Sequence, residues 1–260
     1  MCDAPQMADA RITPIEENLI AWRKVFLDVA SVHDRSASDV IACFSDVPSH
    51  LFNGVCAARF DDWEARGREV VDEFTQRAVP WFWWVTPSTT SPELETLFVS
   101  RGATKGSVPG MHLDLTDWSS TSHGAVQTAV LSPDRPESVD TLMAGYGLPG
   151  NLRSPLLDHA SAFAAHNSMS VLAYVEEKPV AGGLALVTGE TAGLYMITTR
   201  PDYRGQGVGL AVTEGLLEEA RRRGASEAIL HTSAMGRGVY ERIGFEVICE
   251  TTQYVWPTGR

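Results

Sequence analysis

Three glycines at alternate positions, Gly205, Gly207 and Gly209, stand between a strand-like and a helix-like segment. The apolar run Ala192 to Ile197 predicts a strand, and the apolar spacing from Leu210 to Ala220 predicts a helix. Glycine at such a junction accepts positive φ and lets a ligand approach the backbone without a Cβ in the way. The first N–H groups of a helix are unpaired, and the helix dipole favours negative charge there. The sequence therefore predicts an anion site, suited to a phosphate or pyrophosphate.

Two common phosphate-binding motifs do not fit these glycines. A P-loop requires a lysine and then Ser or Thr directly after its last glycine, and the sequence has neither. A dinucleotide fingerprint requires G-x-G-x-x-G, whereas Gly209 is followed by Leu-Ala-Val. A nucleotide-binding protein is therefore the weakest of the hypotheses that the glycines prompt.

The pattern R-G-x-G-x-G that starts at Arg204 resembles the acyl-coenzyme A loop of the GCN5-related N-acetyltransferase (GNAT) superfamily. Downstream, Val239 to Phe245 reads V-Y-E-R-I-G-F and resembles the family's lYerlGF segment. The resemblance implies the α/β GNAT (acyl-CoA N-acyltransferase) fold, with a mixed, mostly antiparallel central sheet flanked by helices. The element order predicted from residue 125 onward, β-α-α-β-β-β-α-β-α-β, is the order of that fold. The pattern alone would indicate only an α/β protein with a mixed sheet.

The two parts of the chain resemble each other in their order of elements. Residues 79–115 predict an aromatic strand, a turn, a short helix, a glycine and a strand, and residues 228–255 predict the same order. The first part has no R-G-x-G-x-G. We therefore expect two tandem GNAT-like domains: a degenerate one over 1–118, a polar linker over 119–124 and the catalytic one over 125–260.

The first part also contains two segments with a clear pattern. Thr13 to Glu16 predicts a capping box for a helix whose apolar face would leave Glu16 and Arg23 outside it. Val79 to Val85 predicts a strand packed in the core on both faces, which we favour over an aromatic ligand cage.

The resemblance implies acetyl-CoA as the cofactor and assigns residues to hold it. The strand end would pair with the pantetheine amides, the loop N–H groups would hold the pyrophosphate, and further contacts would come from the next strand and helix. The residues are Ile197, Thr198, Thr199, Arg204, Gly205, Gln206, Gly207, Val208, Gly209, Ser233, Gly236 and Tyr240. Relatives often carry Asn and Ala where this chain has Ser233 and Gly236, which is a departure from the family's pattern.

Acyl transfer to an amine requires an acid for the leaving thiolate and a base for the amine. Tyr240 matches the family's tyrosine acid, and a phenol with a pKa of about 10 is protonated at neutral pH. The base is open, because the central strand contains no Asp or Glu. The candidates are Glu190 before that strand, His231 at the end of the next one, Tyr195, or a chain of water molecules.

Composition limits the classes of function. The net charge is −12, the hydrophobic share is 44% and the charged share is 21%. An acidic balance without a basic face argues against a nucleic-acid partner and is compatible with a cationic amine substrate. The four cysteines lack disulfide or metal-ligand spacing, so no metal is expected. No long apolar run or signal-peptide core is present, so we expect no membrane partner and a cytoplasmic location.

The leading hypothesis is an N-acetyltransferase that moves the acetyl group of acetyl-CoA to a primary amine of a small molecule or peptide by direct attack on the thioester. The alternative is a non-catalytic acyl-CoA-binding or sensing protein. The expected partners are acetyl-CoA and an unidentified amine acceptor, and the protein would be a monomer or homodimer.

Overall fold

The computed structural model describes residues 9–121 and 126–257. The second half of the expected linker 119–124 lies outside the described residues. The first part of the chain forms α1 (Ile12–Val25), β1 (His33–Asp34), β2 (Val40–Phe44), β3 (Gly54–Ala58), α2 (Trp63–Gln76), β4 (Trp81–Val85), α3 (Pro92–Ser100), β5 (Thr104–Ser107) and β6 (Gly110–Asp114). The second part forms β7 (Gln127–Leu131), α4 (Pro136–Tyr146), α5 (Arg153–Ala164), β8 (Ser168–Val175), β9 (Lys178–Thr188), β10 (Thr191–Thr199), α6 (Val208–Arg222), β11 (Glu227–His231), α7 (Arg237–Ile243), β12 (Glu246–Cys249) and β13 (Thr252–Trp256).

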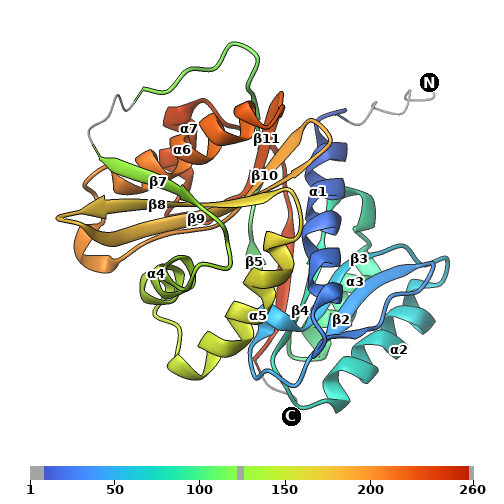
Figure 1. Cartoon of the computed structure of the whole chain (residues 1–260). Helices are drawn as coiled ribbons and strands as arrows, with labels where there is room; N and C mark the ends of the chain where they lie inside the picture. Colours follow the sequence, from blue (N-terminus) through green and yellow to red (C-terminus); the bar gives the residue numbers. More distant parts are fainter. Residues whose placement is uncertain (1–8, 122–125, 258–260) are drawn as a thin grey trace, which may run out of the picture.

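The strands form two mixed sheets, each with a single parallel pair of neighbours. One sheet has the order β1-β2-β3-β4-β13-β5, and the other has the order β12-β6-β11-β10-β9-β8-β7. The parallel pairs are β3 with β4 and β10 with β11. In Figure 1, α6 and α7 cover one face of the second sheet and α4 and α5 lie across its other face. The predicted α/β class, with a mixed and mostly antiparallel sheet flanked by helices, is confirmed.

Each part of the chain contributes one strand to the sheet of the other part. Strand β6 from the first part lies between β11 and β12, and the last strand, β13, lies between β4 and β5. The exchange is symmetric, because each strand follows a strand-helix-strand unit of its own part. The expected division of the chain at 119–124 therefore differs by these two strands from the division between the sheets.

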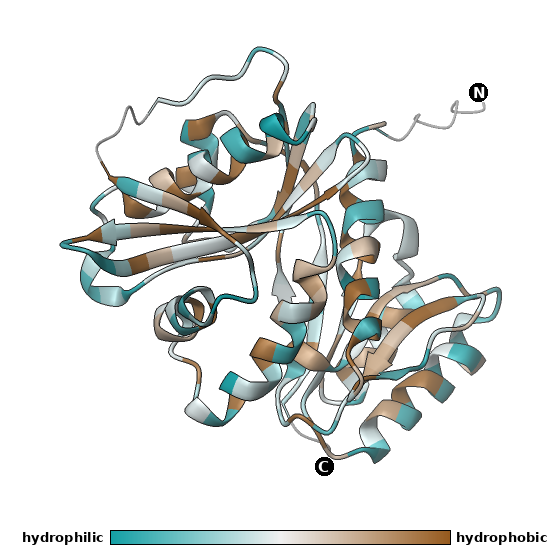
Figure 2. Cartoon of the chain, viewed as in Figure 1, coloured by the Kyte–Doolittle hydropathy of each residue, from teal (hydrophilic) through white to brown (hydrophobic). Residues whose placement is uncertain are grey.

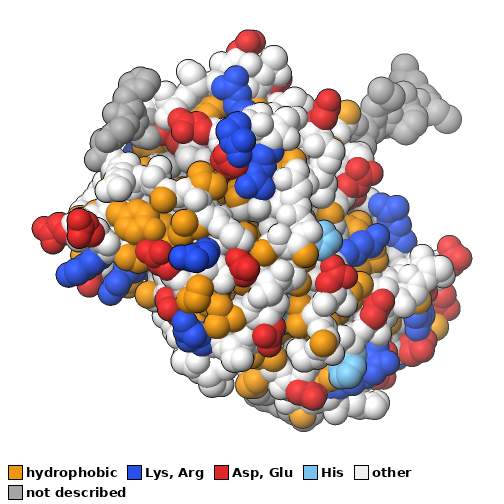
Figure 3. Space-filling model, viewed as in Figure 1, with side chains coloured by type: hydrophobic (Ala, Val, Ile, Leu, Met, Phe, Trp, Pro, Cys, Tyr) orange, Lys and Arg blue, Asp and Glu red, His pale blue; other side chains and the backbone are white. Residues whose placement is uncertain are grey.

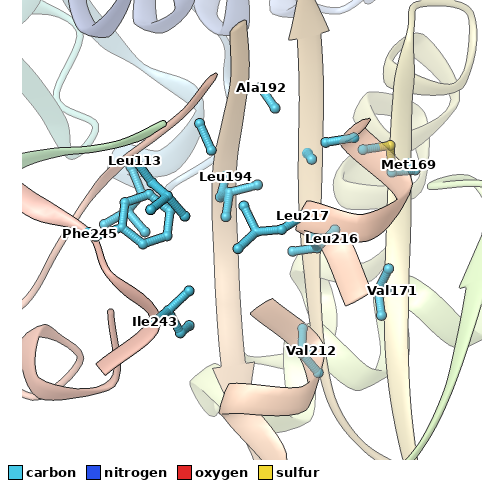
Figure 4. Packing of buried hydrophobic residues seen from close by; sticks show 14 of the residues in the cluster. Leu113, Met169, Val171, Ala192, Leu194, Val212, Leu216, Leu217, Ile243 and Phe245 are labelled. Atoms are coloured by element: carbon cyan, nitrogen blue, oxygen red, sulfur yellow. The ribbon is translucent and has the colours of Figure 1, made fainter. Parts of the chain in front are cut away.

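The exchanged strand β6 shares a core with the second part of the chain. Figure 4 shows Leu113 of β6 against Phe245 and close to Leu194, while Leu216 and Leu217 of α6 come from the other side. Burial of this apolar surface stabilises the fold by roughly 1.5–3 kcal/mol for each large side chain. The two parts are therefore held together by a shared hydrophobic core as well as by their covalent connection.

Helix α1 lies between the two sheets and is covered on more than one face (Figure 1). The expected capping box is wrong: the helix begins at Ile12, before Thr13, and its N-cap residue has no side-chain cap. Glu16 instead accepts a hydrogen bond from the backbone N–H of Ser88 at 2.9 Å. Glu16 and Arg23 fall outside the predicted apolar face of the helix, but they are buried because both sheets pack on α1.

The aromatic strand β4 is core on one face only. Trp81 and Trp83 are fully buried, and the ring of Trp81 stacks on that of Trp256 in β13 at 3.8 Å. On the other face, Phe82 and Trp84 line a cavity. The expectation of a strand packed in the core on both faces is therefore wrong for the second face, where side chains of β4 border the cavity.

The distribution of hydrophobic residues agrees with this packing of helices and strands. In Figure 2, the hydrophobic segments run along the strands and the inner sides of the helices, and the hydrophilic ones gather at turns and outer helix faces. Across residues 9–121 and 126–257, no helix combines the length and apolar character needed to cross a membrane.

Helix α6 is anchored at its C-terminal end by Glu219, which accepts hydrogen bonds from Arg222 and Arg223. Arg223 also donates to the carbonyl of Ser168 at 2.8 Å. The hydrogen bond from Arg222 is the main cause that lowers the pKa of Glu219 from 4.5 to about 2. A depressed carboxyl pKa contributes stability that is complete above pH 4.5 and is lost as the pH falls toward 2.

We expect Glu219→Gln to lower the free energy of unfolding by about 1–2 kcal/mol at pH 7, less than the full pKa shift implies, because Arg222 is exposed to solvent. The loss should shrink between pH 4.5 and pH 2.5 in urea titrations. Glu64→Gln, which breaks an exposed pair with Arg68, is the control and should change stability by less than about 0.5 kcal/mol. Equal losses in both variants would contradict the anchoring role of Glu219.

Candidate active site

The second sheet has an opening between β10 and β11, which diverge toward their C-terminal ends. They pair in parallel from Thr191 with Glu227 to Leu194 with Leu230, and no pairing continues beyond that point. From there β10 pairs only with β9, through a bulge between Tyr195 and Thr198. A bulge re-aims a strand locally and is common beside functional sites. The second half of β10 therefore presents an unpaired backbone edge to the opening.

Met196 sits within this bulge at a φ of +54°, in the left-handed region that a non-glycine residue rarely adopts. Such a conformation costs of order 1–3 kcal/mol and persists only where the surroundings enforce it. The sequence did not predict the bulge, because methionine carries no turn signal. It is the local device that separates the two strands.

The predicted glycine turn follows directly. Gly205 and Gly207 have φ of +75° and +79°, and an added Cβ at either position would meet no atom within 4 Å. Helix α6 begins at Val208, and its first hydrogen bond within the helix is from the N–H of Ala211 to the carbonyl of Gly207. The N–H groups at the start of α6 are free of helical partners, so the turn has the geometry that an anion cradle requires.

A single cavity of about 830 Å³ joins this turn to the opening in the sheet and to the first part of the chain. Its lining includes eleven of the predicted cofactor residues: Ile197, Thr198, Thr199, Arg204, Gly205, Gly207, Val208, Gly209, Ser233, Gly236 and Tyr240. Gln206 is not among the lining residues, and its side chain donates to the carbonyl of Asp202 at 3.1 Å. Because the side-chain amide of Gln206 is used within the turn, its predicted contribution to the cofactor, which is the backbone N–H, stays a prediction.

Two side chains steady the turn and the strand edge from the cavity side. Arg204 donates to the carbonyl of Thr199 at 3.1 Å and to that of Gly145 at 3.3 Å. The hydroxyl of Tyr146 donates to the carbonyl of Ile197 at 3.2 Å. These bonds hold the end of β10 and the start of the turn against the C-terminal end of α4. A pantetheine chain and a diphosphate fit this arrangement, since it offers free N–H groups, a nearby guanidinium and a strand edge whose contacts on this side come from side chains and not from another strand.

Tyr240 lies in α7 with its ring against Phe245 and the backbone of Gly236. A Cβ added at Gly236 would lie 2.9 Å from the Tyr240 ring, so the glycine lets the ring lie directly on the backbone. Burial raises the pKa of Tyr240 above its ordinary value, which keeps the phenol protonated. Its hydroxyl has no hydrogen-bond partner among the described residues and is free to donate. The Ser233 hydroxyl accepts from the N–H of Gly236 at 3.3 Å and thereby caps the turn before α7.

His231 lines the cavity at the end of β11, with its ring 4.9 Å from that of Trp84. Its Nε2 is buried and has no partner among the described residues. Desolvation lowers the pKa of His231 to about 4, so the imidazole is neutral at physiological pH. A neutral imidazole with an unpaired nitrogen can accept or donate one hydrogen bond to a ligand.

Glu190 is not part of the site, and its assignment as a candidate base is wrong. It precedes β10 at the end opposite the opening, where its backbone carbonyl accepts from Ser226 and Glu227. Its carboxylate lies 3.4 Å from the hydroxyl of Ser226 and does not line the cavity. Tyr195 is also occupied: its hydroxyl donates to Asn18 at 2.7 Å, and burial raises its pKa further.

The sequence analysis did not predict that the first part of the chain forms one wall of the cavity. The lining residues from that part include Leu19, Trp22, Arg23, Phe26, His50, Leu51, Phe52, Cys56, Phe82, Trp84 and Val108. The charged side chains in the described lining are Arg23, Arg204 and Arg242, without an Asp or Glu. Helical spacing could place Trp22 and Phe26 beside Arg23, but it could not show that a second sheet covers them. No group of three His, Cys, Asp or Glu side chains within 9–121 and 126–257 is arranged to hold a metal ion.

Comparison with known proteins agrees with this geometry. Residues 156–255 match the acetyltransferase (GNAT) domain family. A curated relative, "Uncharacterized protein YyaT" of Bacillus subtilis (strain 168), is 32% identical over 77 residues, which are 30% of this chain and 52% of the relative. The chain thus spans about half the length of the curated relative that it matches.

Solved structures match nearly the whole chain. A GCN5-related N-acetyltransferase from Kribbella flavida has a TM-score of 0.69 at 19% identity and covers 96% of each chain. One from Sphaerobacter thermophilus has a TM-score of 0.62 at 14% identity, over 96% of this chain and 91% of that one. A tandem GNAT protein from the clavulanic acid biosynthesis pathway has a TM-score of 0.60 at 13% identity, over 96% and 95%. The fold of the whole chain is that of tandem GNAT proteins.

Proposed function

We propose that this chain, whose residues 156–255 match the acetyltransferase (GNAT) domain family, transfers an acetyl group from acetyl-CoA to a primary amine. One observation supports this above the others: a single cavity joins the glycine turn, the open edge of β10 and the unpartnered hydroxyl of Tyr240. A binding site and a proton donor in one enclosure are what transfer from a thioester requires.

The residues at the loop end would hold the cofactor. N–H groups at Gly205, Gly207 and the start of α6 would bind its diphosphate, and the edge of β10 from Ile197 to Thr199 would pair with its amides. When bound, acetyl-CoA supplies an activated acetyl group as a thioester. The acceptor would reach the acetyl group through the opening between β10 and β11, from the side of the first sheet.

The proton transfers would fall to two residues at the opening. Tyr240 Oη would donate a proton to the departing thiolate, and His231 Nε2 would accept one from the amine, directly or through water. A pKa of about 4 leaves His231 unprotonated above that pH, so it is available throughout the neutral range, although it is a weak base. The described lining carries arginines and no carboxylate, so its field is positive. A positive field lowers the pKa of a nearby amine and so increases the fraction in the neutral form that attacks the thioester.

The division of labour along the chain belongs to the same proposal. Residues 125–260 would form the catalytic domain, and residues 1–118 would form a degenerate GNAT-like domain that shapes the acceptor end, with 119–124 as the linker. The exchange of β6 and β13 supports a shared site, since neither sheet is complete without the other part.

Thiol release from acetyl-CoA over a panel of primary amines tests the proposal. We expect coenzyme A to give heat in a calorimeter, thiol to appear only when an amine is added, and the amine to gain the mass of an acetyl group. Reactions without an amine correct for hydrolysis. Absence of coenzyme binding would refute the proposal.

A non-catalytic acyl-CoA sensor is the second candidate, favoured by one observation: the described part of the cavity offers no carboxylate as a base. The same assay separates the two. A sensor binds the coenzyme tightly and releases no thiol with any amine, and it is indifferent to the loss of the Tyr240 hydroxyl.

A further inference from the structure

The end of the cavity formed by the first part of the chain holds a buried arginine. Arg23 of α1 is 3% exposed, and its Nη1 donates to the carbonyl of Leu51 at 3.1 Å. The guanidinium lies 4.6 Å from the centre of the Phe26 ring and 4.8 Å from that of Phe82. Contact with two aromatic faces offsets part of the cost of burying the charge, but it leaves the N–H groups in the guanidinium plane to be satisfied.

One edge of this guanidinium is unsatisfied. Nε and Nη2 of Arg23 are buried and have no hydrogen-bond acceptor among the described residues, which also provide no ion pair to Arg23. Nε–H and the neighbouring Nη2–H lie side by side, the geometry that receives the two oxygens of a carboxylate. A buried charge without a partner is costly, so this edge is a binding feature that the fold itself leaves open.

A second unpaired atom in the same cavity, Nε2 of His159, requires a hydrogen-bond donor from a ligand. His159 of α5 lies 4.8 Å from the Phe26 ring, and its Nδ1 is 2.7 Å from the carbonyl of Pro155, which can only accept. With a pKa lowered by burial to about 4, the ring is neutral at pH 7, so its Nε2 carries a lone pair. That Nε2 is buried without a partner in the described residues. The cavity therefore offers donors at Arg23 and an acceptor at His159.

We propose that Arg23 binds the carboxylate of the acceptor, so that the amine substrate is a small amino carboxylate with an apolar body. The inference rests on the proposed acetyl transfer for the identity of the occupant. The two aromatic rings beside Arg23 suit the apolar body, and His159 can accept from an N–H group of the ligand.

The charges around the cavity favour this occupant over the alternatives. The negative charge of the protein does not form one patch on the face in Figure 3, where acidic side chains are interspersed with basic ones. The described lining carries three arginines and no carboxylate, so a polyamine would find no partner there. A phosphate monoester would bring a second negative charge to an end of the cavity where Arg23 is the cation, since Arg204 belongs to the glycine turn and Arg242 to α7.

Binding of matched probes tests the inference without turnover. N-acetyl amino acids with apolar side chains and the corresponding carboxamides differ only at the carboxylate, and calorimetry with coenzyme A present gives their affinities. We expect the best acid to bind roughly 100-fold more tightly than its amide, as charge-assisted hydrogen bonds imply. Equal affinities, no binding of any acid to the folded protein, or tighter binding of a phosphate monoester of similar size would overturn the proposal.

Variants then assign the effect to Arg23. Arg23→Met keeps an apolar chain between the two rings and should reduce the preference for the acid to less than about threefold. Arg77→Met is the matched control, because Arg77 also stacks on a phenylalanine, Phe44, at 4.1 Å, has an unpaired Nε and does not line the cavity. Arg77→Met should keep the wild-type preference for the acid over the amide. A folded Arg23→Met protein that also keeps this preference would refute the proposal.

Failure of this inference and failure of the proposed function give different results. If acids bind through Arg23 but no amine releases thiol, the carboxylate site stands and acetyl transfer fails. If amines are acetylated equally well with and without a carboxylate, and Arg23→Met leaves this unchanged, acetyl transfer stands and the carboxylate site is overturned.

Discussion

Tyr240→Phe is expected to lower kcat for acetyl transfer by about 100- to 1000-fold and to leave the Kd for coenzyme A within about twofold. The ring remains to pack against Phe245 and Gly236, so the cavity keeps its shape. Only the proton donor to the leaving thiolate is lost. Single-turnover thiol release and calorimetry with coenzyme A measure the two quantities separately.

The pH dependence gives this prediction a second readout. An acid must be protonated to act, and burial raises the pKa of Tyr240 above its ordinary value of 10.0. Its active form is therefore fully populated at every pH below about 10, and wild-type kcat should show no decline from this group between pH 7 and pH 9.5. A kcat that falls in that range in the wild type, but not in Tyr240→Phe, would contradict the raised pKa.

Tyr174→Phe is the matched control for the loss of a hydroxyl. Tyr174 lies in β8, donates to Glu137 at 3.0 Å and does not line the cavity. It should leave kcat within twofold. If Tyr240→Phe also leaves kcat unchanged, the thiolate takes its proton from another source and the role given to Tyr240 is wrong.

Local signals made the second part of the chain predictable. The glycines at 205 and 207 need positive φ, the apolar run before them needs a strand, and Gly224 follows α6 with a φ of +93°. Each of these features is decided within a few residues. The element order and the cradle could therefore be predicted from the sequence.

Long-range pairing could not be predicted in the same way. Alternation in β6 and β13 indicates strands and faces, but it does not identify the neighbour of a strand, and each of these two pairs in the sheet of the other part. The wall formed by Phe82 and Trp84, the burial of Arg23 and the displacement of Glu190 to the far end of β10 all depend on that pairing. The end of the cavity proposed for the acceptor is thus a product of topology, whereas the end proposed for the cofactor is a product of local sequence.

Gly207→Val is expected to weaken coenzyme A binding by roughly 100-fold. Gly207 is the N-cap residue of α6 at a φ of +79°, and no atom lies within 4 Å of an added Cβ. Because Gly207 lines the cavity, the added side chain would project into the space where the diphosphate approaches the free N–H groups. Calorimetry with coenzyme A measures the loss.

The same substitution also strains the backbone, by about 1–2 kcal/mol for a side chain in the left-handed region, so the two effects must be separated. Gly224→Val does this on the same helix: Gly224 follows the C-terminal end of α6 at a φ of +93°, also with no atom within 4 Å of a Cβ, and it is far from the cradle. Both variants should lose similar stability in thermal unfolding, but only Gly207→Val should lose affinity. Equal affinity in the two would mean that the amides of this turn do not bind the diphosphate, and acetyl transfer would then have no means of holding its donor.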